Sequence, residues 1–158
     1  MTKICIVNPQ NIEFYIENLK SNNRKIKLDA LNAIQWYVEA RFSYRKELTG
    51  EEIWIANSLL ECLIGETRNK VIDEILDALC DLTGCIYVPQ ANWEILASEF
   101  LRFKKNWLID QSICLLGRTC SAKYIDLIRP FCTNDNPQIA ETANNAIFEI
   151  EYVCSKIK

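Results

Sequence analysis

The sequence predicts an all-α protein, and three observations support this prediction. Apolar residues recur at helical spacing along most of the 158 residues. The pattern is strongest from Asn69 to Gly84. One face of that segment carries Val71, Ile75, Leu76, Leu79 and Leu82. Glycine and proline number only four each, too few for a turn-rich sandwich or barrel. Related segments also recur along the chain.

Four similar segments repeat with enough chain between them for one further helix each. They are IKLDALNAI from Ile26, VIDEILDAL from Val71, LIDQSICLL from Leu108 and IAETANNAI from Ile139. Their starting points are 45, 37 and 31 residues apart. A repeat of this size with two helices per unit is typical of an α-solenoid.

The first third of the chain divides into a short lead-in and three helices. Lys3–Val7 is an apolar run before Pro9 that fits either a strand or an irregular segment. Helices are expected at Asn11–Lys20, at Arg24–Phe42 and from Glu51 to about Ile64. Ile26 belongs to the expected inward face of the second helix. Thr49 is the expected N-cap of the third helix and Gly65 its end.

The helix from Asn69 follows, and Gly84 is expected to end it in the left-handed conformation. Cys85–Val88 is a second short run of β-like character, closed by Pro89. Further helices are expected at Gln90–Phe103, Asn106–Arg118, Ala122–Arg129 and from Pro137 onward. Asn136 is the expected cap of the last helix, with proline at its first position.

The second helix of each predicted pair resembles a HEAT repeat of the short form found in bacterial HEAT-like proteins. The resemblance lies in DALNAI (29–34), DALCDL (77–82), CLLGR (114–118) and NPQIAETANNAI (136–147). It implies a right-handed α-α superhelix of about four helix pairs, forming one domain over residues 1–158. Trp36 and Tyr37 depart from the pattern, because smaller residues are usual there. An ordinary helical bundle whose helices share an apolar period is the alternative.

An acidic row follows the polar side of the helix from Asn69. Asp73, Asp77 and Asp81 are four residues apart, and Glu74 lies beside them. Like charges at this spacing cost about 0.2–0.5 kcal/mol per pair. A basic partner would explain such a row; a solvated face of an acidic protein is the alternative.

HEAT folds bind partners on the concave surface that their second helices line, and the repeat register selects candidate residues there. One aligned column is Leu28, Asp73, Asp110 and Glu141. The next is Asn32, Asp77, Cys114 and Asn145, and the third is Trp36, Asp81, Arg118 and Glu149. The predicted partner-binding residues are Asn32, Trp36, Asp73, Glu74, Asp77, Asp81, Asp110, Glu141, Asn145 and Glu149.

Composition argues against an enzyme, a cofactor and a metal site. The chain has no histidine for a Ser–His or Cys–His pair and no glycine-rich phosphate loop. Paired carboxylates such as Asp73 and Asp77 remain a minor alternative for acid–base chemistry. The eight cysteines form no CxxC motif and mostly lie in apolar patterns, which predicts free, buried thiols.

The expected compartment is the cytoplasm, without contact to membrane or nucleic acid. The sequence has no apolar run long enough to span a bilayer, and its first residues lack the apolar core of a secretory signal. A net charge of −3 disfavours anionic partners such as nucleic acid.

Small, acidic, helical proteins without catalytic groups resemble the immunity partners of contact-dependent or polymorphic bacterial toxins, several of which are HEAT-like. The resemblance implies an immunity protein that neutralises a cognate, basic toxin domain such as a nuclease. The alternative is a HEAT-like adaptor or assembly chaperone related to bilin lyases. The sequence leaves the oligomeric state and the identity of the toxin open.

Overall fold

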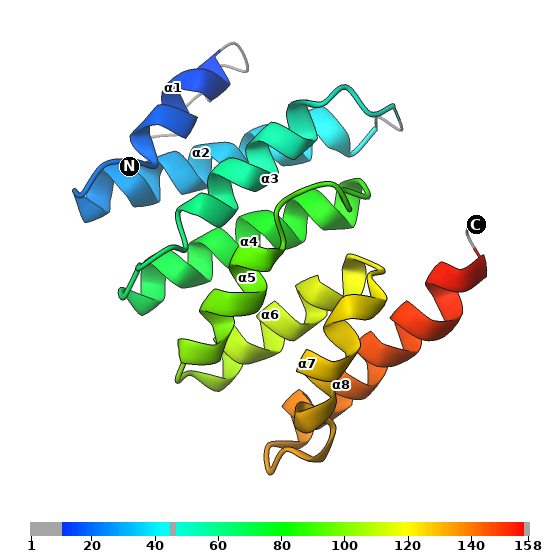
Figure 1. Cartoon of the computed structure of the whole chain (residues 1–158). Coiled ribbons are helices and arrows are strands. Elements are labelled where there is room, and N and C mark those ends of the chain that lie inside the picture. Colours follow the sequence, from blue (N-terminus) through cyan, green and yellow to red (C-terminus); the bar gives the residue numbers. More distant parts are fainter. Residues whose placement is uncertain (1–10, 45–46, 157–158) are drawn as a thin grey trace.

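The computed structural model describes residues 11–44 and 47–156 (Figure 1). All regular secondary structure in these residues is helical, so the all-α prediction is confirmed there. The apolar run Lys3–Val7 lies outside the described residues. No helix in the described ranges combines the length and apolar character needed to cross a membrane.

Eight α-helices make up most of this part of the chain. They are α1 (Ile12–Asn18), α2 (Arg24–Phe42), α3 (Glu51–Glu61), α4 (Asn69–Cys85), α5 (Glu94–Glu99), α6 (Asn106–Arg118), α7 (Ile125–Ile128) and α8 (Pro137–Phe148). Short 3₁₀ turns follow or precede several of them: η2 (Phe100–Arg102), η3 (Ala122–Tyr124), η4 (Arg129–Thr133) and η6 (Cys154–Lys156). A π-helical turn, η5 (Glu149–Val153), extends α8.

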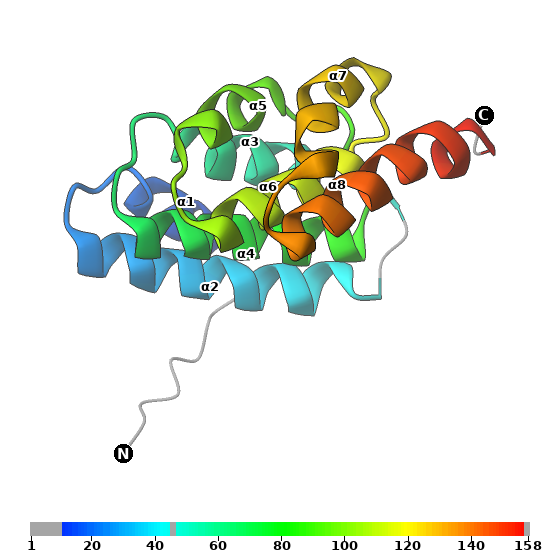
Figure 2. The same cartoon turned by 90° about the horizontal axis from the view of Figure 1, so that it is seen from below.

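The helices form two layers. α2, α4, α6 and α8 lie side by side in that order, and each packs against the next (Figure 2). α1, α3, α5 and α7 cover one side of this row (Figure 2). The core lies between the layers, and the predicted apolar face of α4 is fully buried there. The opposite side of the α2–α4–α6–α8 row carries polar side chains and is the surface of interest below.

The predicted inward position of Ile26 is wrong. Its side chain is 41 % exposed, whereas Lys27, one position on, is buried. The buried stripe of α2 continues from Lys27 through Ala30, Leu31 and Ile34. Lys27 takes the core position of the first turn because Glu66 neutralises its ammonium group, with Nζ 3.4 Å from Oε2.

The start of α3 also differs from the prediction. Gly50, in the left-handed conformation with φ of 87°, is the N-cap, and Thr49 stands one residue earlier. The fully buried Glu52 reaches back to this turn and accepts hydrogen bonds from the amides of Thr49 and Gly50. Thr49 Oγ1 accepts a hydrogen bond from the amide of Glu51 at 3.4 Å, so both side chains satisfy amides at the start of α3, although Thr49 is not the N-cap.

The expected role of Gly84 is wrong as well. Gly84 stays within α4, which runs on to Cys85, and the chain leaves in an extended conformation at Ile86. The glycines with positive φ are Gly50 and Gly65, and Gly65 follows α3 as predicted. Cys85–Val88 forms no strand, because the amide of Ile86 still bonds to the carbonyl of Leu82 and the rest is loop.

The last helix begins as predicted. The Asn136 side chain accepts hydrogen bonds from the amides of Gln138 and Ile139, at 3.0 and 3.3 Å, and Pro137 occupies the first position. Gly117 lets α6 and α8 approach closely, since a Cβ there would lie 2.8 Å from that of Ala146. Close packing of α6 against α8 therefore requires the glycine of the CLLGR segment (114–118).

The thiol prediction holds in part. The described free cysteines are Cys62, Cys80, Cys85, Cys114 and Cys132, all half-buried. Burial raises the pKa of Cys62 to about 11 and that of Cys80 to about 12. Cys120 is disulfide-bonded, so the expectation that every cysteine is a free thiol is wrong there. An apolar sequence pattern indicates burial but carries no information on pairing.

Candidate protein-binding surface

Nine of the ten predicted partner-binding residues lie on the helices of the α2–α4–α6–α8 row, and Glu149 begins η5, which extends α8. The exposed ones are Asn32, Trp36, Asp81, Glu141 and Asn145, and the half-buried ones are Asp73, Glu74, Asp77, Asp110 and Glu149. We call the outward side of this row, with the carboxylates of α4 along its middle, the acidic face.

Burial and repulsion by neighbouring carboxylates raise the pKa of two aspartates on α4, Asp73 and Asp81. Partial burial raises the pKa of Asp73, and the neighbouring carboxylate of Asp77 adds to the rise. Burial likewise raises the pKa of Asp81, with further contributions from Asp77 and from Glu39 on α2. The structure therefore brings a fourth carboxylate, Glu39, to the row, which the sequence analysis did not include.

Cations compensate only the first turn of the row. Lys70 forms an ion pair with Glu74, and its Nζ lies 3.9 Å from Oδ2 of Asp73. Asp77 and Asp81 form no ion pair with a lysine or arginine among the described residues. Ion pairs with the row are therefore confined to its first turn, whereas the cation near the C-terminal half of α4, Arg118, bonds to the carbonyl of Cys80 and to Thr83.

Two glutamines connect the row to the neighbouring helices. Gln35 Nε2 on α2 donates to the backbone carbonyl oxygen and to Oε2 of Glu74, both at 3.2 Å. Gln111 Nε2 on α6 donates to Oδ1 of Asp77 at 2.6 Å. Asp77 and Glu74 thus help to hold the row of helices together.

The register of α2 against α4 differs from the predicted columns. The repeat alignment places Gln35 level with Cys80, whereas its side chain meets Glu74. Ser43 likewise meets Cys85, with Oγ and Sγ 3.9 Å apart. The contacts are therefore displaced from the alignment, by six residues at Gln35 (Glu74 in place of Cys80) and by three at Ser43 (Cys85 in place of Val88), because an apolar period does not fix the register of two helices.

Trp36 follows Gln35, the residue of α2 that contacts Glu74. Its side chain is 60 % exposed, so it is a surface residue and not part of the core. A large exposed indole provides apolar contact area on α2.

The α6 portion of the acidic face contains two acceptors without donors. Asp110 Oδ1 and Gln111 Oε1 are buried and have no hydrogen-bond partner within the described part of the chain. Arg118, aligned with Asp81 in the predicted columns, turns instead toward the end of α4. Its NH1 donates to the carbonyl of Cys80 at 3.1 Å and to Oγ1 of Thr83 at 3.0 Å.

The sequence matches no protein-family model and no curated protein. The functional assignment therefore depends on the geometry and charge of the acidic face.

The acidic face carries carboxylates, amides, half-buried thiols and an exposed indole. In the ranges that the structure describes, no three or more His, Cys, Asp or Glu side chains are grouped so that they could hold a metal ion. The thiols near the row are held protonated, since burial raises the pKa of both Cys80 and Cys114. Carboxylates, amides and an exposed indole remain, which bind cationic side chains and apolar groups.

Proposed function

We propose that this protein is an immunity protein that binds a basic toxin domain, a nuclease, and neutralises it through the acidic face. In this proposal the four helix pairs form a right-handed HEAT-like superhelix whose second helices present that face. The ordered packing of α2, α4, α6 and α8 beside one another supports such an arrangement.

The uncompensated charge at Asp77 and Asp81 carries the proposal. These carboxylates repel each other, and Glu39 adds its own charge to theirs, yet no basic side chain of the described chain pairs with either aspartate. A partner that supplies lysine or arginine side chains relieves this repulsion on binding. The free protein is left with a mildly unfavourable surface, which is the expected cost of a binding site for cations.

A nuclease fits this surface for a simple reason. Nucleases bind phosphates and are therefore basic around the active site. An acidic face attracts such a domain at long range and raises the association rate by about 10- to 1,000-fold. The same face then covers the groups that would otherwise bind nucleic acid. Trp36 adds an aromatic anchor of the kind that dominates binding energy at interfaces.

A growth assay tests the proposal. Each gene adjacent to the one for this protein is expressed in a bacterial host, alone and together with the protein. We expect one neighbour to arrest growth as a nuclease and the protein to restore growth and bind that neighbour directly. If no neighbour is toxic, or if the protein binds its neighbour without relieving toxicity, the proposal is wrong and an adaptor or assembly role takes its place.

A further inference from the structure

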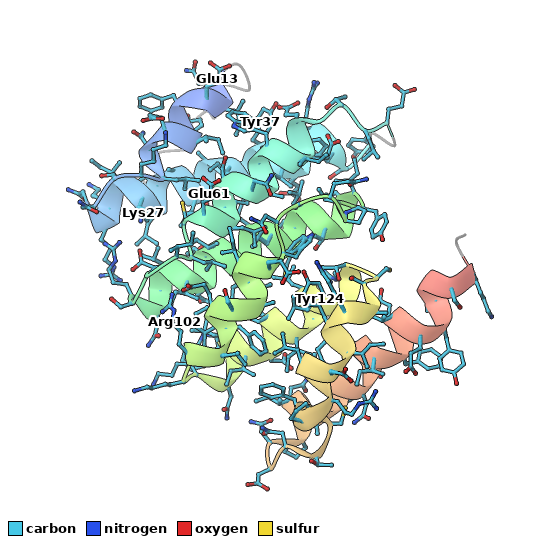
Figure 3. All side chains as sticks on the ribbon, viewed as in Figure 1. Glu13, Lys27, Tyr37, Glu61, Arg102 and Tyr124 are labelled. Atoms are coloured by element: carbon cyan, nitrogen blue, oxygen red, sulfur yellow. The ribbon has the colours of Figure 1, made fainter. Side chains whose placement is uncertain are left out.

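A cavity of about 280 Å³ lies where the loop after α4 meets the turn between α6 and η3. Tyr124, which lines it, is marked in Figure 3 at the end of η3. None of the residues that line the cavity belongs to the acidic face. The proposed immunity function gives this cavity no role.

Aromatic side chains form the walls, and their positions are fixed. Trp93 and Tyr124 are each 3 % exposed. The indole Nε1 of Trp93 donates to the carbonyl of Val88 at 2.8 Å, and the hydroxyl of Tyr87 donates to the carbonyl of Thr119 at 3.2 Å. The walls are therefore fixed in place, and among these three rings Tyr87, 49 % exposed, presents the aromatic surface that a ligand can reach.

The charge at the mouth of the cavity is positive. Among the described residues that line it, Lys123 carries the single formal charge, and no acidic side chain takes part. Its ammonium lies 4.9 Å from the centroid of the Tyr124 ring and pairs with Glu94, which stands outside the lining. Lys123 and Glu94 are both more than half exposed, so this ion pair opens at little cost.

Hydroxyl donors lie beside the ammonium. Ser121 lines the cavity, and its side chain makes no hydrogen bond to the first turn of η3. Burial raises the pKa of Tyr124, which keeps its hydroxyl protonated. An ammonium with neighbouring hydroxyls is a suitable set of donors for a carboxylate.

We propose that this cavity binds a small aromatic carboxylate. Its ring packs against Tyr87, and its carboxylate replaces Glu94 on Lys123 and accepts a hydrogen bond from Ser121. A volume of about 280 Å³ is just below the usual range for drug-sized ligands, about 300–1,000 Å³, and so favours a ligand with one ring.

Calorimetric titration with benzoate tests the proposal, with two variants that are expected to act in opposite directions. We expect binding to the unmodified protein with a dissociation constant of about 1 mM. Lys123→Gln should weaken it about tenfold by removing the charge-assisted bond. Glu94→Gln should tighten it, because the competing carboxylate is gone. Benzamide, which lacks the charge, should bind weakly and equally to all three proteins.

Lys105→Gln is the matched control. Lys105 also lies near an aromatic ring, 5.8 Å from that of Trp107, but neither residue lines the cavity. This change should leave benzoate binding unaltered. The proposal is overturned if benzoate fails to bind at about 20 mM, or if Lys123→Gln and Lys105→Gln behave alike. Failure here leaves the acidic-face proposal untouched, because the two share no residue.

Discussion

Replacing Glu66 tests which contacts stabilise this fold. Its side chain is 5 % exposed and lies in the turn between α3 and α4. Its carboxylate accepts hydrogen bonds from Arg68 Nε at 2.8 Å and NH2 at 2.7 Å, and from the amides of Thr67 and Arg68 at 3.0 Å. Lys27 Nζ lies 3.4 Å away. Arg68 is the main reason that the pKa of Glu66 falls to about 2, against the opposing effect of burial.

The lowered pKa of Glu66 determines how much this carboxylate stabilises the fold and how that stability depends on pH. A fall from 4.5 to about 2 corresponds to about 3 kcal/mol of stability, at about 1.4 kcal/mol per pKa unit. Because the carboxylate is ionised more readily in the folded state, this contribution is fully present above about pH 4.5. It is lost as the pH falls toward 2. Glu66→Gln should therefore lower the free energy of unfolding at pH 7 by about 3 kcal/mol or more.

Urea unfolding at pH 7, 4.5, 3 and 2 measures this directly. The difference in unfolding free energy between the unmodified protein and Glu66→Gln should shrink steadily below pH 4.5. At pH 7 the melting temperature should fall by about 6–12 °C. Glu17→Gln is the control, since Glu17 pairs with Lys20 but both side chains are 70 % exposed. A difference that stays constant from pH 7 to 2 would refute the assignment of the lowered pKa to Glu66.

Four further substitutions have expected outcomes. Gly117→Ala should destabilise the protein by about 1–3 kcal/mol in thermal or urea unfolding, because the added methyl group lies 2.8 Å from a side chain of α8. Asp77→Ala should cost about 1.5–3 kcal/mol through loss of the 2.6 Å hydrogen bond to α6, whereas Asp81→Ala should change stability by no more than about 0.5 kcal/mol. Equal effects would show that the two aspartates have the same surroundings. Trp36→Ala should leave the melting temperature unchanged and raise the rate of partner dissociation; a fall in melting temperature would place the indole in the core.

Helix bounds were predictable where local signals agree. The bounds of α2 and α6 match the predicted ranges, and Asn136 caps α8 as expected, because periodicity and capping depend on neighbouring residues. Gly84 and Thr49 show the limit of such signals. α3 begins after Gly50, where Glu52 bonds back to the amides of Thr49 and Gly50, and α4 continues past Gly84 to Cys85.

Contacts between distant segments were not predictable. Glu66 pairs with Lys27, which is 39 positions away in the sequence. Gln111 donates to Asp77, which is 34 positions away. The sequence around these residues does not indicate either contact. The acidic row on α4 was visible because it lies on a single helix. The approach of Glu39 to Asp81 and the contact of Gln35 with Glu74 depend on the register between α2 and α4, which an apolar period does not fix.

The association rate of the toxin domain with this protein, measured as a function of salt, tests the central claim most directly. For the unmodified protein the rate should fall steeply with salt, because the acidic face attracts the partner at long range. The double variant Asp73→Lys/Asp81→Lys should bind more slowly at low salt and lose most of this dependence. A control with the same change in charge is Glu13→Lys/Glu61→Lys, on α1 and α3 (Figure 3), and it should behave like the unmodified protein. Equal rates and equal salt dependence for the two double variants would contradict the claim that the acidic face is the binding site.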